Sequence, residues 1–190
     1  MSRPRLDISL SRTSQSGARI NLGRTAVYGP SHERLQQDIA LVGDAINKCS
    51  GAHLSLAKFV LAKLVREELG LSTFDKRLFG ALLGRQLRLG GVEAILGEST
   101  GGKTFWVIVN GQRLSDFQIA LDIAENLLIR QRVVSIKELE TALFSSRSYG
   151  TWSSATHVCG HLVYFGRAQY DDDTVASRPE GLDDAFRATD

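Results

Sequence analysis

The chain has 190 residues, which is enough for one large domain or two small ones. Hydrophobic residues make up 43% of it and charged residues 23%, a balance that indicates a folded globular protein rather than a disordered chain. No apolar run reaches the length of a membrane-spanning helix and no charged-then-apolar leader opens the chain. We therefore expect no membrane contact and a cytoplasmic location, on the nucleoid if the source is bacterial.

The net charge of +2 is a sum over regions of opposite sign. Residues 1–30 hold five Arg and one Asp, and residues 71–113 hold six basic and three acidic residues. Residues 151–190 instead hold three Arg and seven acidic residues. This distribution is compatible with binding a polyanion through part of the surface. The cysteines, Cys49 and Cys159, lie in apolar patterns away from any metal-ligand spacing, so we expect reduced, packed thiols.

The first 28 residues do not have a helical pattern. Leu6, Ile8 and Leu10 alternate with polar residues, as do Ile20 and Leu22. Alternation of this kind is typical of strands. We therefore predict a basic β-hairpin or a partly ordered basic arm, and Gly29-Pro30-Ser31 ends it.

Three helices and a hairpin are predicted next from apolar residues at helical spacing and from their end signals. The helices span residues 32–48, 55–69 and about 74–89. Ser31 is a plausible N-cap of the first, Gly70 is placed to end the second, and Gly90-Gly91 to end the third. Strand-forming residues then predict a β-hairpin over residues 91–110.

The same order of elements then recurs in outline. A helix over residues 116–131 is expected to begin at the capping box Ser115–Gln118, and a short helix to about Phe144 at the box Ser135–Glu138. A third helix is predicted from Trp152 to Tyr164, followed by one strand over residues 167–170. Residues 171–190 are acidic and poor in apolar residues, and we predict an acidic disordered tail.

Helix, helix, turn, helix, hairpin is the order of the winged helix-turn-helix. Over about residues 31–170 the chain therefore resembles tandem winged-helix DNA-binding proteins, on element order alone. The predicted fold class is mainly α with small β-hairpins (α+β), containing two winged-helix units in tandem. The predicted domains are a basic arm or β-hairpin over 1–30, a first winged-helix unit over 31–112, a second over 113–170 and the tail over 171–190.

The segment Gly97–Thr104 matches the phosphate-binding pattern G-x-x-x-x-G-K-[ST]. That pattern requires a helix after the lysine, so that helix N–H groups face the phosphates. Here the strand-forming run from Phe105 to Val109 follows at once. We therefore interpret the segment as a hairpin tip, or wing, on which Lys103 and Thr104 contact a DNA phosphate; a turn without a ligand is the main alternative.

The helix over residues 74–89 is the strongest candidate for contacting DNA. Its outward side carries small residues between basic ones, and the basic ones are Lys76, Arg77, Arg85 and Arg88. Small residues allow a helix to approach the major groove, and arginines bind guanine or phosphate. Exposed basic residues are also common on helix faces that contact only solvent, so a solvated face without a ligand is the alternative.

Two further groups of residues are weaker candidates. In the helix over residues 152–164 we expect an exposed polar side that includes Ser153, Ser154 and His157. In the N-terminal region we expect phosphate contacts from Arg5, Arg19 and Arg24, with dimer formation or a soluble arm as alternatives. His157 and His161 have the spacing of a helical metal pair but no third ligand nearby, so we expect no metal.

These patterns together predict a non-enzymatic duplex DNA-binding protein acting in transcription regulation or DNA maintenance. No cofactor is expected, and the predicted partners are duplex DNA and a second copy of the chain in a homodimer. The main alternative is a protein-docking subunit of a larger assembly, with a protein partner on the second unit. A small P-loop nucleotide-binding protein is the remaining alternative.

Overall fold

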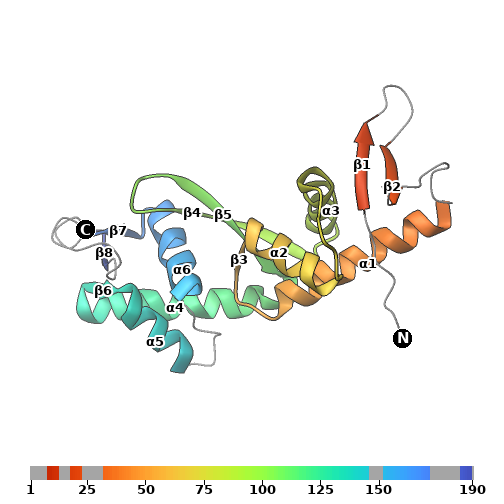
Figure 1. Ribbon diagram of the computed structural model, residues 1–190. Helices are drawn as coiled ribbons and strands as arrows, with labels where there is room; N and C mark the ends of the chain where they lie inside the picture. The colour runs from red at the N-terminus through yellow and green to blue at the C-terminus, as the bar shows by residue number, and fades with distance from the viewer. Residues whose placement is uncertain (1–7, 13–17, 23–31, 146–151, 172–184, 190) are drawn as a thin grey trace. The chain divides into compact units, whose positions relative to one another are not determined.

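The computed structural model describes residues 8–12, 18–22, 32–145, 152–171 and 185–189 (Figure 1). At the N-terminus, β1 (Ile8–Arg12) and β2 (Ala18–Leu22) pair antiparallel, with Leu10 opposite Ile20. Of the two structures predicted for this region, the chain adopts the β-hairpin over these strands.

Three helices lie between this hairpin and the next one, in agreement with the predicted order. They are α1 (His32–Gly51), α2 (Lys58–Glu68) and α3 (Lys76–Arg88). Gly70 ends α2 as predicted: its φ is +66°, and the N–H groups of Gly70 and Leu71 donate to the carbonyls of Glu67 and Arg66. The prediction that α2 begins at residue 55 was wrong, because β3 (Leu56–Ala57) pairs with Ile108 and Val107. Ser31 lies outside the described residues.

The predicted hairpin over residues 91–110 is confirmed as β4 (Val92–Glu98) and β5 (Thr104–Asn110). With β3 it forms a three-stranded sheet in the order β3-β5-β4. Val107, Ile108 and Val109 of β5 are buried. The short 3₁₀ helix η1 (Gly111–Arg113) connects β5 to the next helix.

The second half of the chain repeats the element order of the first. It consists of α4 (Leu114–Gln131), β6 (Val133–Ser135), α5 (Ile136–Ser145), α6 (Trp152–Tyr164), β7 (Ala168–Tyr170) and β8 (Ala185–Ala188). Its sheet has the strand order β6-β8-β7, so in both sheets the last strand lies between the other two. The fold is thus α+β, with two small antiparallel sheets among mostly helical elements.

The C-terminal segment corrects a prediction. Residues 171–190 were expected to be disordered, but Ala185–Ala188 form the central strand of the second sheet, with Val134 and Tyr170 opposite Phe186. Phe186 is fully buried, and Asp171 is also buried. Burial of one large aromatic side chain offsets much of the entropy lost by ordering a short strand. Residues 172–184 and 190 lie outside the described residues.

Only one of the two predicted capping boxes forms. At α5, the Ser135 N–H donates to the Glu138 carboxylate and the Glu138 N–H donates to the Ser135 hydroxyl, as predicted. At α4, the Ser115 box was wrong, because the helix already begins at Leu114. Asn110 provides the cap one turn earlier, where its side-chain oxygen accepts from the Gln112 N–H of η1 at 3.0 Å.

The chain consists of two compact units. The first contains residues 1–49 and 58–92, and the second contains residues 50–57 and 93–190. In the second, one apolar core runs through α4, α5, α6 and the flanking strands, with Phe117, Leu139 and Leu162 among its buried residues. The sequence-based domain boundaries at residues 30, 112 and 170 stay predictions.

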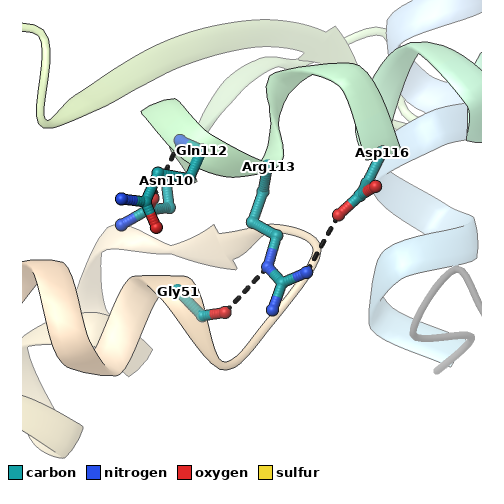
Figure 2. Close-up of polar contacts among 5 residues, drawn as sticks. All are labelled: Gly51, Asn110, Gln112, Arg113 and Asp116. Atoms are coloured by element: carbon teal, nitrogen blue, oxygen red, sulfur yellow. Dashed lines mark hydrogen bonds and ion pairs between the residues drawn. The ribbon is translucent and has the colours of Figure 1, made fainter.

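Polar contacts within the second compact unit join the segment before α4 to Ser50 and Gly51 (Figure 2). Arg113 donates from Nε to the Gly51 carbonyl at 2.9 Å and pairs with Asp116 at 3.0 Å. The Gly51 carbonyl belongs to the last turn of α1, where carbonyls have no partner within the helix. The Asn110 side-chain amide donates to the buried Ser50 hydroxyl at 2.9 Å. Arg113 and Asn110 therefore satisfy groups at the C-terminal end of α1.

Within the described residues, no helix is both long enough and apolar enough to cross a membrane.

Candidate nucleic-acid interface

The helix α3 has well-defined ends. The Asp75 carboxylate accepts from the N–H groups of Arg77 and Leu78, both at 2.8 Å, which makes it the N-cap. At the other end Gly90, at φ +72°, and Gly91 donate to the carbonyls of Leu87 and Gln86. This is the glycine C-cap that the sequence predicted.

One side of α3 is buried and the other is cationic. Leu78, Phe79 and Leu83 are at most 2% exposed, whereas the four predicted basic residues are all exposed. We call these four the cationic face: Lys76, Arg77, Arg85 and Arg88. None of them forms an ion pair with another described residue, and the helix itself contains no acidic residue. Among the residues of α3 and its N-cap, the acidic side chain is that of Asp75.

Small residues lie between the basic ones. Ala81 is exposed and Gly80 and Gly84 are half-buried. A Cβ at Gly80 would lie 3.6 Å from Lys58 Nζ, and one at Gly84 would lie 3.7 Å from an Arg88 nitrogen. Neither glycine has a positive φ, and both contacts are ordinary ones with flexible side chains. A glycine within a helix costs about 1 kcal/mol relative to alanine, and packing within the chain does not require either one.

Lys58 is a basic residue that the sequence analysis missed. It is the first residue of α2, it is exposed, and its ammonium lies next to Gly80 of α3. In the sequence, Lys58 stands 18 positions before the cationic face, next to an apolar run. No local pattern could have linked it to α3, because the link depends on how the two helices pack.

The segment Gly97–Thr104 forms a hairpin tip and not a strand–loop–helix. The Ser99 N–H donates to the Lys103 carbonyl at 3.0 Å, and the Gly102 N–H donates to the Ser99 carbonyl at 2.9 Å. With Gly102 at φ +68°, this is a three-residue hairpin loop that ends in a left-handed residue. Lys103 and Thr104 are both exposed there. The predicted hairpin is confirmed; contact of its tip with DNA stays a prediction.

The exposed side expected on α6 was wrong for two of its three residues. Ser153 is exposed, but Ser154 is 2% and His157 is 9% exposed. The β4–β5 hairpin packs on α6, with Phe105 next to His157. A Cβ at Gly160 would lie 2.7 Å from the Glu98 carbonyl oxygen, so the two backbones touch. Ser154 and His157 are therefore not available to a DNA molecule.

Further contacts join the hairpin to the second repeat. His161 Nδ1 is 2.8 Å from the Leu96 carbonyl oxygen, and the Tyr170 hydroxyl donates to the Glu98 carbonyl at 2.8 Å. The Phe105 ring lies 6.0 Å from the His157 ring, centroid to centroid. The helix α6, which has the same place in its repeat as α3, is thus used for packing within the chain.

His157 is a buried histidine with a polar partner. Its Nδ1 is 2.7 Å from the hydroxyl oxygen of Ser55, which is also buried. Burial disfavours the charged imidazolium and lowers the pKa of His157 from 6.5 to about 4. The folded protein therefore keeps this side chain neutral where a solvent-exposed histidine would be largely protonated.

This lowered pKa predicts acid sensitivity. Between pH 6.5 and about 4 the unfolded chain binds a proton at His157 that the folded chain does not. Because the unfolded state binds more protons in this window, the free energy of unfolding should decrease as the pH is lowered. The decrease from this group is at most about 1.4 kcal/mol per pH unit. Urea unfolding at several pH values should show a shallower slope for His157→Asn than for the wild type. If the free energy of unfolding changes with pH equally in both proteins, the lowered pKa of His157 is contradicted.

The N-terminal arginines are only partly described. Arg19 lies in β2, whereas Arg5 and Arg24 lie outside the described residues. Among the described residues, no group of three or more His, Cys, Asp or Glu side chains is placed to hold a metal ion. Cys49 and Cys159 form no disulfide, and Cys159 is buried.

No protein-family model matches the chain, and no curated protein matches it in sequence.

Proposed function

We propose that the protein binds duplex DNA, without enzymatic activity, through the cationic face of α3, in transcription regulation or DNA maintenance. The observation that carries this proposal is the exposure of four basic side chains on one helix, none of which is paired with an acidic side chain of the described residues. Uncompensated positive charge on one face is the electrostatic requirement for binding a phosphate backbone. Lys58 also lies beside this face, next to Gly80.

We further propose that both repeats are winged-helix units, in which α3 and α6 hold the position of the recognition helix. Two observations support this: both repeats have the element order helix, strand, helix, helix, strand, strand, and in both sheets the last strand lies between the other two. In the proposed arrangement only α3 contacts DNA, because α6 is covered by β4 and β5. Lys103 at the hairpin tip is proposed to add one phosphate contact, and the protein to act as a homodimer.

The test is DNA affinity as a function of salt concentration. For Arg85→Ala/Arg88→Ala we expect the slope of log affinity against log salt to fall by about two, about 0.9 for each lost phosphate contact. Fluorescence anisotropy with a labelled duplex and the full chain measures this slope. The matched control is Arg130→Ala/Lys137→Ala, which removes two exposed charges from α4 and α5. The proposal fails if the wild type binds no duplex at low salt, or if both variants lose affinity equally.

A protein-docking role is the second candidate, and exposed apolar residues in the second repeat favour it. Ile129 of α4 is 78% exposed and Phe144 of α5 is 74% exposed. Large apolar side chains with such exposure are common at protein interfaces. If this were the main function, the charge variant on α3 would leave the interaction of the protein with its partner unchanged.

A further inference from the structure

The cationic face of α3 is divided into two groups. Lys76 and Arg77 lie in the first turn of the helix, and Arg85 and Arg88 lie in its last turns. Arg77 and Arg85 are eight positions apart, which corresponds to about 12 Å along a helix at about 1.5 Å per residue. The major groove of B-DNA is also about 12 Å wide. The two groups can therefore reach the phosphates on both sides of one groove.

Between the two groups, the exposed surface of α3 lacks hydrogen-bonding side chains. It consists of Gly80, Ala81 and Gly84. Reading a base pair in the major groove requires side-chain donors or acceptors opposite the base edges, such as amides or guanidinium groups. The polar groups next to the two glycines are the Lys58 ammonium beside Gly80 and the Arg88 guanidinium beside Gly84, and both are cations that can bind a phosphate.

From this distribution we infer that α3 binds the two phosphate backbones of a duplex and discriminates little among base sequences. The inference rests on the proposed function and specifies its substrate class: duplex DNA recognised by backbone spacing. The cations at the ends of the helix supply affinity and register, which phosphate contacts can do without sequence information. A duplex is required, because a single strand does not offer two backbones about 12 Å apart.

The experiment is a selection from a duplex pool with a randomised central segment, using the full chain at low and moderate salt. We expect the protein to bind duplexes from the pool without enriching any sequence motif over the starting pool. Alternating A·T and alternating G·C duplexes of equal length should then bind within about threefold of each other, because phosphate contacts carry no base information. An enriched motif that binds about tenfold or more tightly than the pool would overturn the inference, since one good base contact accounts for that ratio.

A charge-preserving variant gives an independent readout. In Arg77→Lys/Arg85→Lys/Arg88→Lys the positive charges stay, but the planar groups that bind guanine are lost. We expect affinity within about threefold of the wild type and an unchanged salt slope, as for contacts with phosphate. A loss of about tenfold or more, confined to particular sequences, would show base reading instead. If the wild type binds no duplex from the pool at low salt, the proposed function itself is wrong. That result differs both from an enriched motif and from a sequence-confined loss of affinity in the lysine variant.

Discussion

Replacing Phe186 with Ala is expected to lower the free energy of unfolding by about 3–5 kcal/mol, the usual cost of removing a buried aromatic side chain. Phe186 has no exposed surface and belongs to the core of the second compact unit. It lies on the central strand of its sheet, opposite Val134 on one side and Tyr170 on the other. The space left by the ring would therefore face both neighbouring strands.

Urea unfolding, followed by circular dichroism, measures this effect as a lower midpoint at an unchanged slope. The matched control is Ala188→Ser, two residues along the same strand, where the side chain is exposed. That variant should stay within about 0.5 kcal/mol of the wild type, as surface changes usually do. If both variants unfold at the wild-type midpoint, β8 does not contribute to the stability of the fold, contrary to its central place in the sheet.

The strand β8 also shows why sequence reasoning failed at the C-terminus. Ala185–Ala188 is a run of four residues with one arginine, in a strongly acidic region. Nothing in so short a run marks a strand, since its stability comes from partners about 50 positions earlier, at Val133–Ser135, and from the burial of Phe186. The same reason explains β3, a strand of two residues that exists only through its pairing with β5.

Local signals, in contrast, predicted local structure well. Gly70 and Gly90 end their helices because a left-handed residue satisfies the last carbonyls, and the sequence alone places them there. The reciprocal bonds of Ser135 and Glu138 are equally local. The box at Ser115 failed because Asn110, five positions earlier, already caps the preceding turn. A competing cap of this kind is visible only once the chain direction at that turn is known.

The candidate site likewise contains residues that local spacing predicted and residues whose burial depends on distant contacts. The exposure of Lys76, Arg77, Arg85 and Arg88 followed from helical spacing, because the apolar stripe of α3 fixes which side is buried. On α6 the same reasoning failed for Ser154 and His157. His157 lies against Phe105 of a hairpin more than 40 positions away in the chain, and its polar ring can be buried because Ser55 satisfies it.

The close approach of Gly160 to the Glu98 carbonyl leads to a second large expected effect. Changing Gly160 to Val should destabilise the second compact unit by more than the about 1–3 kcal/mol typical of overpacking, because rigid backbone stands in the way. The first added carbon would lie 2.7 Å from the Glu98 carbonyl oxygen and 2.5 Å from the Phe105 ring. The ring can rotate away, but the carbonyl moves only if the hairpin leaves α6.

Two measurements separate this effect from ordinary destabilisation. Urea unfolding gives the free energy of unfolding, and hydrogen exchange of the amides in β4 and β5 reports whether the hairpin has left α6. We expect faster exchange in both strands of Gly160→Val than in the wild type under native conditions. The control is Gly101→Ala at the hairpin tip, where an added carbon meets no atom within 4 Å and φ is not positive.

The same variant tests why α6 differs from α3. If packing on the hairpin is what keeps α6 from presenting a surface, Gly160→Val should expose His157 while leaving the cationic face of α3 unchanged. DNA affinity should then fall by no more than the one phosphate contact proposed for Lys103, since α6 carries no arginine or lysine to add another. A larger loss of affinity in a folded Gly160→Val protein would instead mean that DNA binding depends on the position of the hairpin beyond this one contact.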